Sequence, residues 1–359
     1  MTKDGKVGIG IIGFGGIAQA AHAPGYRAIP EQCEIVAIAD IDLARREEAR
    51  SDKWKIPNVF EDYRRMLEMP EIDAVSVCTP NYVHKEPTVD ALHAGKHVLC
   101  EKPMAINAIE ARAMRDAAHA AGKQLQIGYN WRFAAGAQSL KRAVDAGKLG
   151  DIYYARAQAL RRRGVPGWGV FTQKDKQGGG PLIDIGVHIT DLTLWLMGHK
   201  KPVAASAQIY TKFGNREGVI GTMGQWDPAI YTVEDFAVGL VRFEDGSTLT
   251  LESSFIANLA KDVFTTHLFG VEGGALFDMG DYTLFREEYG TLTDSKPGWL
   301  PEVPSSHGEE VRAFVRTVKE GIPVAETGAA TGEQGLMVTQ IMDALYRSGE
   351  EKREVAIEE

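Results

Sequence analysis

The sequence predicts an α/β protein, in which an N-terminal domain with a doubly wound parallel sheet precedes an α+β domain with an open, mainly antiparallel sheet. Three observations support this fold class. The first 128 residues alternate between short apolar runs and helical patterns. A glycine-rich motif directly follows the first apolar run. After Gly128, strands with partial polar alternation follow one another across short turns, which is typical of antiparallel sheets.

Five apolar runs predict the strands of the N-terminal domain. They are Val7–Ile12, Glu34–Ala39, Ala74–Cys78, His97–Cys100 and Gln124–Ile127. Because these runs are continuously apolar, we expect both faces of the parallel sheet to be buried. The stretches between them are rich in Ala, Glu and Arg and predict helices over residues 42–53, 83–94 and 107–121. Proline at position 24 should end or kink the helix that follows the glycine-rich motif.

The second domain is predicted to contain six strands and three helices. The predicted strands are Gly150–Leu160, Ala204–Phe213, Glu234–Phe243, Ser247–Ser254, Thr265–Gly270 and Gly274–Asp278. The predicted helices are Ile183–Leu196, Glu309–Glu320 and Thr331–Ser348, and residues 212–230 read as a loop. We therefore divide the chain into domains 1–128 and 129–359, and the last helix is free to pack back on the first domain.

Composition excludes several classes of partner. The chain has 40 Lys and Arg against 49 Asp and Glu, a net charge of -9, which argues against nucleic acid or an anionic membrane surface as the main partner. Its apolar stretches are far shorter than the roughly 20 residues needed to span a bilayer. The N-terminus lacks the pattern of a signal peptide, and three cysteines without a C-x-x-C motif indicate reduced thiols. We therefore expect a cytoplasmic protein.

The glycine-rich motif covers Gly13–Ala18 and fits the pattern G-x-G-x-x-(G/A) of a dinucleotide-binding, or Rossmann, domain. Its first glycine makes the tight turn, the second lets the backbone approach a pyrophosphate, and the small third position lets helix and strand pack closely. Asp40 ends the second strand, where an acid binds the ribose. A negative charge there repels a 2′-phosphate and favours NAD over NADP, although Arg45 and Arg46 follow closely. The alternative is a structural turn with a capping aspartate.

Two further strand ends carry candidate site residues. Thr79 and Asn81 flank Pro80 after the third strand, and His84 follows. This edge binds ligands in open α/β sheets, but Thr and Asn also start helices, and His84 alone reads more readily as a helix-face residue. Glu101-Lys102-Pro103 ends the fourth strand, where the lysine meets a low-dielectric environment suited to acid–base chemistry. The alternative is an exposed lysine.

Asp184 and His188 are spaced i, i+4, so one helix face presents a carboxylate and an imidazole. Histidine is the side chain best matched to proton transfer near neutral pH. A capping aspartate with a core histidine is the structural alternative. A metal site with Asp191 as third ligand lacks supporting His or Cys residues, so no metal is expected.

Two more segments border the predicted site. Residues 128–133, which include Tyr129, Asn130 and Arg132, lead from the last parallel strand into the second domain. Arg163 closes a run of three arginines and precedes Trp168, whose ring is suited to stacking on a sugar. Such a charged run is usually a solvated face, and most tryptophans simply pack.

Taken in order, these motifs resemble the Gfo/Idh/MocA family of nicotinamide-dependent oxidoreductases, which includes glucose–fructose oxidoreductase and inositol dehydrogenase. The resemblance rests on residues 13–18, 79–84, 101–103, 128–133 and 178–188, and on the closing segment 344–357. It implies a Rossmann domain followed by an open-sheet domain that often builds homo-oligomers. It also implies that Lys102, Asp184 and His188 are catalytic: His188 takes the hydroxyl proton, Lys102 donates to the developing alkoxide, and Asp184 orients the network.

The resemblance implies a sugar, glycoside or cyclitol as substrate, and the segment 161–171 is similar to members that oxidise pyranose or glycoside hydroxyls at C3. An NAD-dependent glycosidase and a non-catalytic NAD-binding sensor are the alternatives. We expect NAD to contact Gly13, Phe14, Gly15, Gly16, Ile17, Asp40, Thr79, Asn81, His84, Glu101, Lys102, Asn130 and Arg132. We expect the substrate to contact Lys102, Tyr129, Arg163, Trp168, Asp184 and His188.

Overall fold

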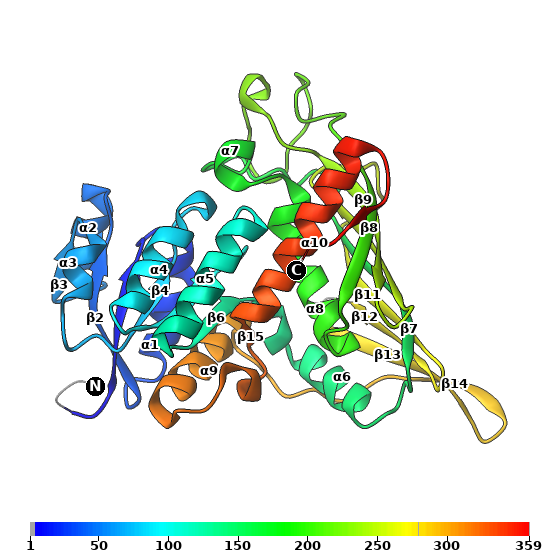
Figure 1. Cartoon of the computed structure of the whole chain (residues 1–359), viewed down its shortest axis with the longest axis horizontal. Helices are drawn as coiled ribbons and strands as arrows, with labels where there is room; N and C mark the ends of the chain where they lie inside the picture. Colours follow the sequence, from blue (N-terminus) through cyan, green and yellow to red (C-terminus); the bar gives the residue numbers. More distant parts are fainter. Residues whose placement is uncertain (1–3, 279, 359) are drawn as a thin grey trace. The chain divides into compact units, whose positions relative to one another are not determined.

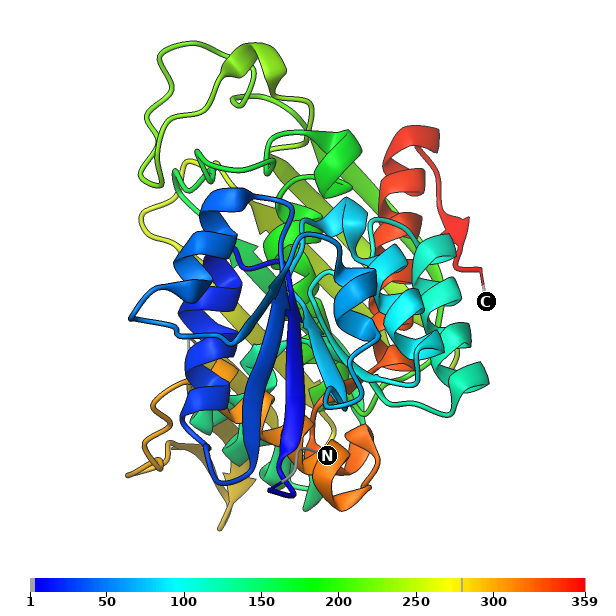
Figure 2. The same ribbon diagram turned by 90° about the vertical axis from the view of Figure 1, so that its left-hand side faces the viewer.

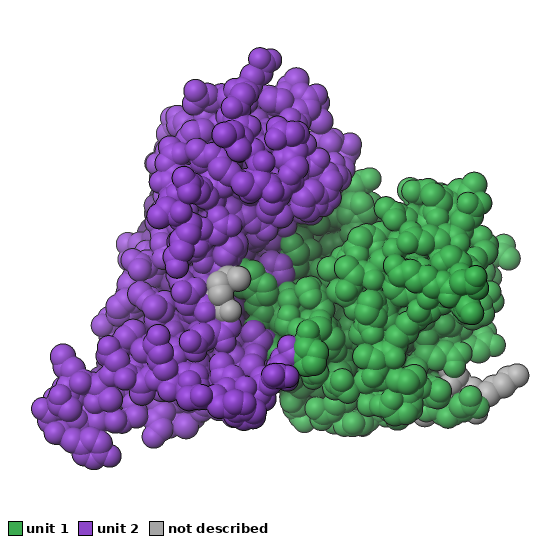
Figure 3. Space-filling view, turned by 180° about the vertical axis from the view of Figure 1, so that it is seen from behind, with its two compact units in different colours: residues 1–133, 304–336 green, residues 134–303, 337–359 purple. Residues whose placement is uncertain are grey.

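A computed structural model describes residues 4–278 and 280–358 as two compact units (Figure 3). Unit 1 comprises residues 1–133 and 304–336, and unit 2 comprises residues 134–303 and 337–359. The sequence placed its domain boundary at residue 128. Unit 1 also takes in a late segment of the chain that the sequence assigned to the second domain.

Unit 1 is built on a sheet with the strand order β15-β6-β5-β4-β1-β2-β3 (Figure 2). The strands are β1 (Val7–Ile12), β2 (Cys33–Ala39), β3 (Asn58–Phe60), β4 (Ala74–Val77), β5 (His97–Glu101), β6 (Leu125–Gly128) and β15 (Ala330–Thr331). All neighbours pair in parallel except β15, which runs antiparallel to β6. The predicted doubly wound parallel sheet is therefore confirmed, with β3 and β15 as strands that the apolar pattern missed.

Helices cover both faces of this sheet (Figure 2). They are α1 (Ala23–Arg27), α2 (Leu43–Arg50), α3 (Tyr63–Leu67), α4 (Lys85–His93), α5 (Ala108–Ala121) and α9 (Ser306–Glu320). The helices α1 and α9 pack against each other, as do α4 and α5. Side-chain caps define the starts of two of the predicted helices, because Asp42 accepts from the amide of Ala44 and Asn107 accepts from that of Glu110.

The sequence predicted that Pro24 ends or kinks the helix after the glycine-rich motif, and the structure shows that the helix does not end there. A π-helical turn, η1 (Ala18–His22), leads directly into α1, and the amide of Ala23 bonds to the carbonyl of Ala18. Pro24 lies in the first turn of α1, where proline is tolerated because it has no amide hydrogen to contribute. The wider turn therefore absorbs the proline without breaking the helical path.

The segment 304–336 belongs to unit 1 because α9 completes its core. Val311, Phe314 and Val315 of α9 are buried in one apolar cluster with Ile9 and Ile11 of β1. The amphipathic pattern of the segment predicts a helix but does not say which sheet the helix will cover.

Unit 2 contains a sheet with the strand order β14-β13-β12-β11-β7-β10-β9-β8-β16 (Figure 1). The strands are β7 (Ile152–Leu160), β8 (Pro202–Tyr210), β9 (Phe236–Phe243), β10 (Thr248–Ser254), β11 (Val263–Gly270), β12 (Gly274–Asp278), β13 (Asp281–Glu288), β14 (Thr291–Ser295) and β16 (Val355–Ala356). The sheet is mainly antiparallel, as predicted. The exception is β10, which pairs in parallel with β7 although it is also the hairpin partner of β9.

Helices lie on one face of this sheet (Figure 1). They include α6 (Ala135–Asp145) and a continuous helical segment formed by the π-helical turn η4 (Leu182–Gly186) and α8 (Val187–Met197). The short helix α7 (Lys174–Gln177) precedes η4, and α10 (Gly332–Glu351) precedes β16. Strands β7 and β10 alternate buried and partly exposed residues, so their inner positions face the helices and their outer positions do not. In the described parts of the chain, no helix is both long enough and apolar enough to cross a membrane.

Candidate active site

The glycine-rich turn of unit 1 has the geometry that a dinucleotide requires. Gly13 has a φ of +83°, and a Cβ there would lie 2.8 Å from the carbonyl oxygen of Cys78. A Cβ on Gly15 or Gly16 would meet nothing within 4 Å. Gly13 is therefore needed for the fold, whereas the next two glycines leave bare backbone that a phosphate group can approach.

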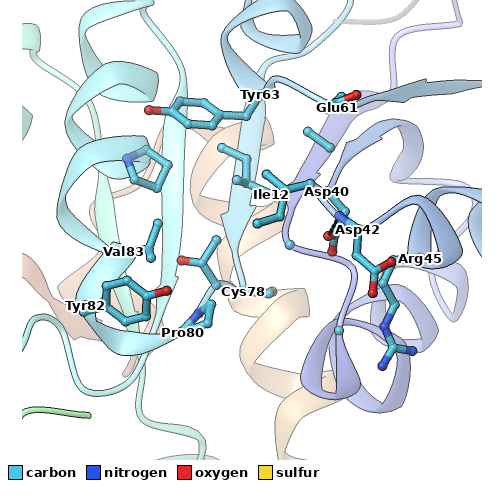
Figure 4. A pocket seen from close by; sticks show the side chains of 16 residues that line it. Ile12, Asp40, Asp42, Arg45, Glu61, Tyr63, Cys78, Pro80, Tyr82 and Val83 are labelled. Carbon is cyan, nitrogen blue, oxygen red and sulfur yellow. Dashed lines mark hydrogen bonds between the residues drawn. The ribbon is translucent and has the colours of Figure 1, made fainter. Parts of the chain in front are cut away.

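A cavity of about 360 Å³ opens beside this turn at the carboxyl edge of the sheet (Figure 4). The ends of β1, β2 and β4 contribute to its wall. Among its lining residues are Ile12, Gly13, Gly15, Asp40, Asp42, Arg45, Glu61, Tyr63, Thr79, Pro80, Tyr82 and Val83. The cavity thus lies where Rossmann domains hold the dinucleotide.

Asp40 is held in place by backbone amides. One carboxylate oxygen accepts from the amide of Phe14 at 2.7 Å and the other from that of Asp42 at 2.8 Å. The guanidinium of Arg46 is engaged by other groups than this carboxylate. It donates to the backbone carbonyls of Asp40 and Ile41 and pairs with Glu61. Arg45 lines the cavity and pairs with Glu48. The cavity wall thus presents a fixed carboxylate beside an arginine that already has a partner.

The cavity fits a dinucleotide on independent grounds. The hydroxyl oxygen of Thr79 is buried and has no hydrogen-bond partner among the described residues. A buried hydroxyl is normally paired, so this oxygen is suited to a ligand group. Gly15 and Gly16 supply the open backbone, and Asp40 supplies an acceptor for a ribose. Only the backbone of Phe14 faces this side, since its ring is fully buried against Trp54. Ile17 also packs against the core.

His84 does not line the cavity. It is buried, and its two ring nitrogens lie 2.8 Å from the carbonyl oxygens of Pro103 and Thr79. The ring therefore ties together the two segments that leave β4 and β5. Burial lowers the pKa of His84, although both carbonyl contacts act in the opposite direction. Asn81, at the start of the intervening turn, is also buried.

Lys102 follows a buried network at the end of β5. The Glu101 carboxylate lies 2.8 Å from Nε2 of His22 and accepts from the amide of Lys102 at 3.2 Å. Nδ1 of His22 contacts the hydroxyl of Ser76. Burial acts to raise the pKa of Glu101, but the hydrogen bond and charge of His22, with the charges of His307 and Lys102, outweigh it and lower the pKa. Glu101 is thus a buried anion that fixes the backbone at Lys102.

The segment after β6 is anchored by late parts of the chain. The side-chain nitrogen Nδ2 of Asn130 donates to the hydroxyl of Ser306 at 2.8 Å, and the side-chain oxygen of Asn130 has no partner among the described residues. Arg132 is buried and donates to Gln334. Tyr129 is also buried.

In unit 2, Asp184 lies in η4, and His188 lies in the first turn of α8. Asp184 is buried, and its carboxylate is 3.7 Å from the guanidinium of Arg161. The sequence identified the arginine run but not this pair. Asp184 and His188 thus belong to unit 2, and Lys102 to unit 1.

The other two predicted substrate residues lie in the segment of unit 2 between β7 and α7. Arg163 donates to Asn258 and to the carbonyl of Ala257, and its guanidinium lies over the ring of Phe213. Trp168 is 55% exposed, with one edge against Phe171. Arg163 is therefore committed to loop contacts, whereas most of the Trp168 ring remains accessible.

Two family models match the chain. A model described as "Oxidoreductase family, NAD-binding Rossmann fold" covers residues 7–129, and a model of the GFO/IDH/MocA C-terminal domain covers residues 137–276. The chain belongs to the Gfo/Idh/MocA family. It is accordingly an NAD(P)-dependent oxidoreductase that acts on CH–OH groups.

Named relatives of this family extend over nearly the whole chain. A D-glucoside 3-dehydrogenase of Escherichia coli (strain K12) is 40% identical over 95% of both chains. A myo-inositol 2-dehydrogenase of Thermotoga maritima is 28% identical over 98% of both.

Solved structures share the fold. An oxidoreductase domain protein from Kribbella flavida superposes with a TM-score of 0.86 at 27% identity, over 99% of this chain and 100% of that one. A levoglucosan dehydrogenase in complex with NADH and levoglucosan gives 0.84 at 24% identity, with the same coverage.

Sequence reasoning missed several polar residues that interact with the predicted site residues or with the helix that carries them. The charges of His22 and His307 help to lower the pKa of Glu101. Glu234 accepts from the amide of Gly180, at the start of the helix that carries Asp184. Each lies far from its partner in sequence, so no local spacing points to it. Among the described residues, no group of three or more His, Cys, Asp or Glu side chains is arranged to hold a metal ion.

Proposed function

We propose that this protein oxidises the C3 hydroxyl of a glucoside and transfers the hydride to NAD. The general reaction, oxidation of a sugar or cyclitol hydroxyl, is that of the family members it matches. The observation that supports the finer assignment is the 40% identity to a D-glucoside 3-dehydrogenase over 95% of both chains. The presence of Lys102, Asp184 and His188 supports an active enzyme over a nucleotide-binding sensor.

NAD is the proposed cofactor because of the charge at the cavity wall. Asp40 is fixed by two backbone amides and can accept from the ribose hydroxyls. Asp42 and Glu61 line the same cavity, and Arg46 is engaged with Glu61. A 2′-phosphate would meet several carboxylates and few uncommitted cations, which disfavours NADP.

The chain's own residues would bind and activate the substrate. When bound, the nicotinamide ring accepts a hydride from the carbinol carbon. We propose that His188 takes the hydroxyl proton and that Lys102 donates a hydrogen bond to the oxygen as negative charge develops. Asp184, itself paired with Arg161, orients this polar network. The backbone on either side of Lys102 is fixed, because its amide donates to the Glu101 carboxylate and the next residue, Pro103, contacts the ring of His84.

Some of the other predicted contacts keep their assignments in this proposal, whereas His84, Glu101 and Arg163 change from direct to supporting roles. NAD would be held by backbone atoms of Gly13–Ile17, by the hydroxyl of Thr79 and by the side chains of Asn81 and Asn130. Arg132 would support this segment from the protein interior. His84 and Glu101 would act through the backbone they support. Tyr129 and Trp168 would contact the sugar, and Arg163 would shape the loop beside it.

The proposal is tested by incubating the purified protein with NAD and methyl glucosides. We expect reduced nicotinamide to accumulate with one equivalent of 3-keto-glucoside, identified by NMR. A p-nitrophenyl glucoside in parallel reports release of the aglycone. Aglycone release without NADH would instead favour an NAD-dependent glycosidase, and NAD binding without either product would favour a sensor.

We further propose a homo-oligomer in the cytoplasm. The outer face of the unit 2 sheet carries Tyr154 and Phe269, whose rings lie 5.0 Å apart, and the partly exposed Phe285. Partly exposed aromatic side chains of this kind are suited to contact with a second copy of the chain. The described cysteines Cys33, Cys78 and Cys100 are buried and unpaired, which fits a reducing compartment.

A further inference from the structure

A buried carboxylate lies at the start of the helix that carries Asp184 and His188. Glu234 lies two positions before the first residue of β9 and is 4% exposed. Its two oxygens accept from the amides of Gly180 at 2.9 Å and Leu182 at 3.0 Å. Amides at the first turn of a helix have no partner within the helix, so this carboxylate caps the helix from a distant part of the chain.

Glu234 is itself held by the last helix and by a nearby tyrosine. The hydroxyl of Tyr346, in α10, donates to the carboxylate at 2.8 Å. The hydroxyl of Tyr231 donates to the backbone carbonyl of Glu234 at 3.1 Å. Burial raises the pKa of Glu234 against the lowering effect of these amides and of Tyr346, and burial with the nearby carboxylate raises the pKa of Tyr346. Burying the Glu234 carboxylate is therefore costly, and its three hydrogen bonds offset this cost.

The glycines before the helix are explained by the close approach of Tyr346 and Glu234. A Cβ on Gly179 would lie 1.9 Å from the hydroxyl oxygen of Tyr346. A Cβ on Gly180 would lie 2.3 Å from the carbonyl oxygen of Glu234. On the sheet side, Ser253 donates to the carbonyl of Pro181 at 2.8 Å. The chain is thus fixed on two sides just before Asp184.

We propose that Glu234, supported by Tyr346, is a positioning residue that sets the placement of Asp184 and His188 for catalysis. Asp184 follows Leu182 by two residues, and His188 lies within the next turns of the same helix. A shift at Gly180 or Leu182 therefore displaces both side chains together. This inference depends on the proposed function, in which these two residues act on the substrate.

The test is Glu234→Gln, which keeps size but removes charge. The side-chain oxygen of the glutamine can still accept from Leu182 and Tyr346. Its NH₂ group then faces the amide of Gly180, and because both groups are donors, that hydrogen bond is lost. We expect kcat for the glucoside to fall about 10- to 100-fold, as for small displacements of reacting groups. The Kd for NAD should change less than about twofold. Tyr346→Phe, which removes one donor, should show a smaller loss of kcat.

Asp235→Asn is the matched control. Asp235 is equally buried, is the next residue in the chain and accepts from the amides of Lys212, Phe213 and Gly214. It should lower Tm comparably but change kcat less than about threefold, because its contacts are to a loop rather than to the helix. The imidazole NMR signals of His188, assigned by their loss in His188→Ala, should shift in Glu234→Gln and not in Asp235→Asn.

The outcomes separate the inference from the proposed function. If Glu234→Gln lowers only Tm, with normal kcat and unshifted His188 signals, Glu234 is merely structural and the inference is wrong. If His188→Ala itself retains turnover, the proposed catalytic assignment is wrong whatever Glu234→Gln does.

Discussion

At the wall of the dinucleotide cavity, the side chain of Asp40 makes two amide contacts and leaves further lone pairs for a ligand. A carboxylate in this position discriminates between the two nicotinamide cofactors by charge. Replacing it should therefore change the ratio of affinities more than it changes the fold.

We predict that Asp40→Ser weakens NAD binding and strengthens NADP binding. The ratio of the two Kd values should change by about 100-fold, because charge interactions near a surface contribute up to ~4 kcal/mol and 1.4 kcal/mol is tenfold. Fluorescence titration with each cofactor measures it. Asp52→Asn removes the same charge from a fully exposed side chain and should leave the ratio unchanged. An unchanged ratio in Asp40→Ser would remove Asp40 from cofactor selection.

We predict that Lys102→Met and His188→Ala each lower kcat about 10²- to 10⁴-fold, the range typical of lost acid–base groups. Binding of NAD should persist, because the glycine turn and Asp40 are intact. Stopped-flow binding and steady-state turnover together separate the two effects. Lys148→Met, at an exposed lysine, is the control. Near-normal turnover in either active-site variant would contradict the assignment.

At the scale of single elements, the glycine-rich turn contains glycines with different duties. Gly13 has a positive φ and lies against the carbonyl of Cys78, whereas Gly15 faces open space. Both match the same motif, yet only one is required for folding.

We predict that Gly13→Ala lowers the free energy of unfolding by about 1–3 kcal/mol through backbone strain and the clash with Cys78. Gly15→Ala should change stability by less than about 1 kcal/mol, but it should weaken NAD binding at least about tenfold because the methyl group occupies the phosphate approach. Urea unfolding and NAD titration distinguish them. If both variants were equally stable and bound NAD equally well, the assignment of Gly13 to folding and Gly15 to NAD binding would be wrong.

The sequence predicted those elements whose signal is local. The strands β1, β2, β4, β5 and β6 are continuous apolar runs, and their predicted bounds differ from the observed ones by only a residue or two. The strand β3 has three residues, and β13 and β14 are largely polar at the sheet margin, so none of them produces a recognisable pattern. The parallel pairing of β10 with β7 joins segments that are far apart in sequence and was beyond a local reading.

The same distinction applies to the candidate site. Asp40, Lys102, Asp184 and His188 follow strands or share a helix face, so local position makes them candidates. The family resemblance then implies the catalytic roles of Lys102, Asp184 and His188. Glu234 acts on Gly180 across 54 positions of sequence and looks like any glutamate before a strand. Positioning residues of this kind become visible only when the chain is folded.

At the scale of the whole molecule, the outer face of the unit 2 sheet bears on assembly. We predict that the double variant Phe269→Asp, Phe285→Asp lowers the molar mass measured by light scattering after size exclusion, because two buried charges disfavour an apolar interface. Ile109→Asp, on α5 of unit 1, introduces a charge at another exposed apolar residue and serves as control. An unchanged mass in the double variant would mean that copies join elsewhere or not at all.

The contribution of α9 and β15 to unit 1 bears on how the protein is made. Ribosomes deliver the chain from its N-terminus, and early domains commonly fold while synthesis continues. Here unit 1 combines residues 1–133 with residues 304–336, so its second part is made only after residues 134–303 of unit 2. Until that stretch emerges, the apolar side that Val311, Phe314 and Val315 will cover stays uncovered on the nascent protein. We therefore expect co-translational folding of unit 1 to be completed only after residues 304–336 have emerged, and a product terminated before them would be a natural client for chaperones.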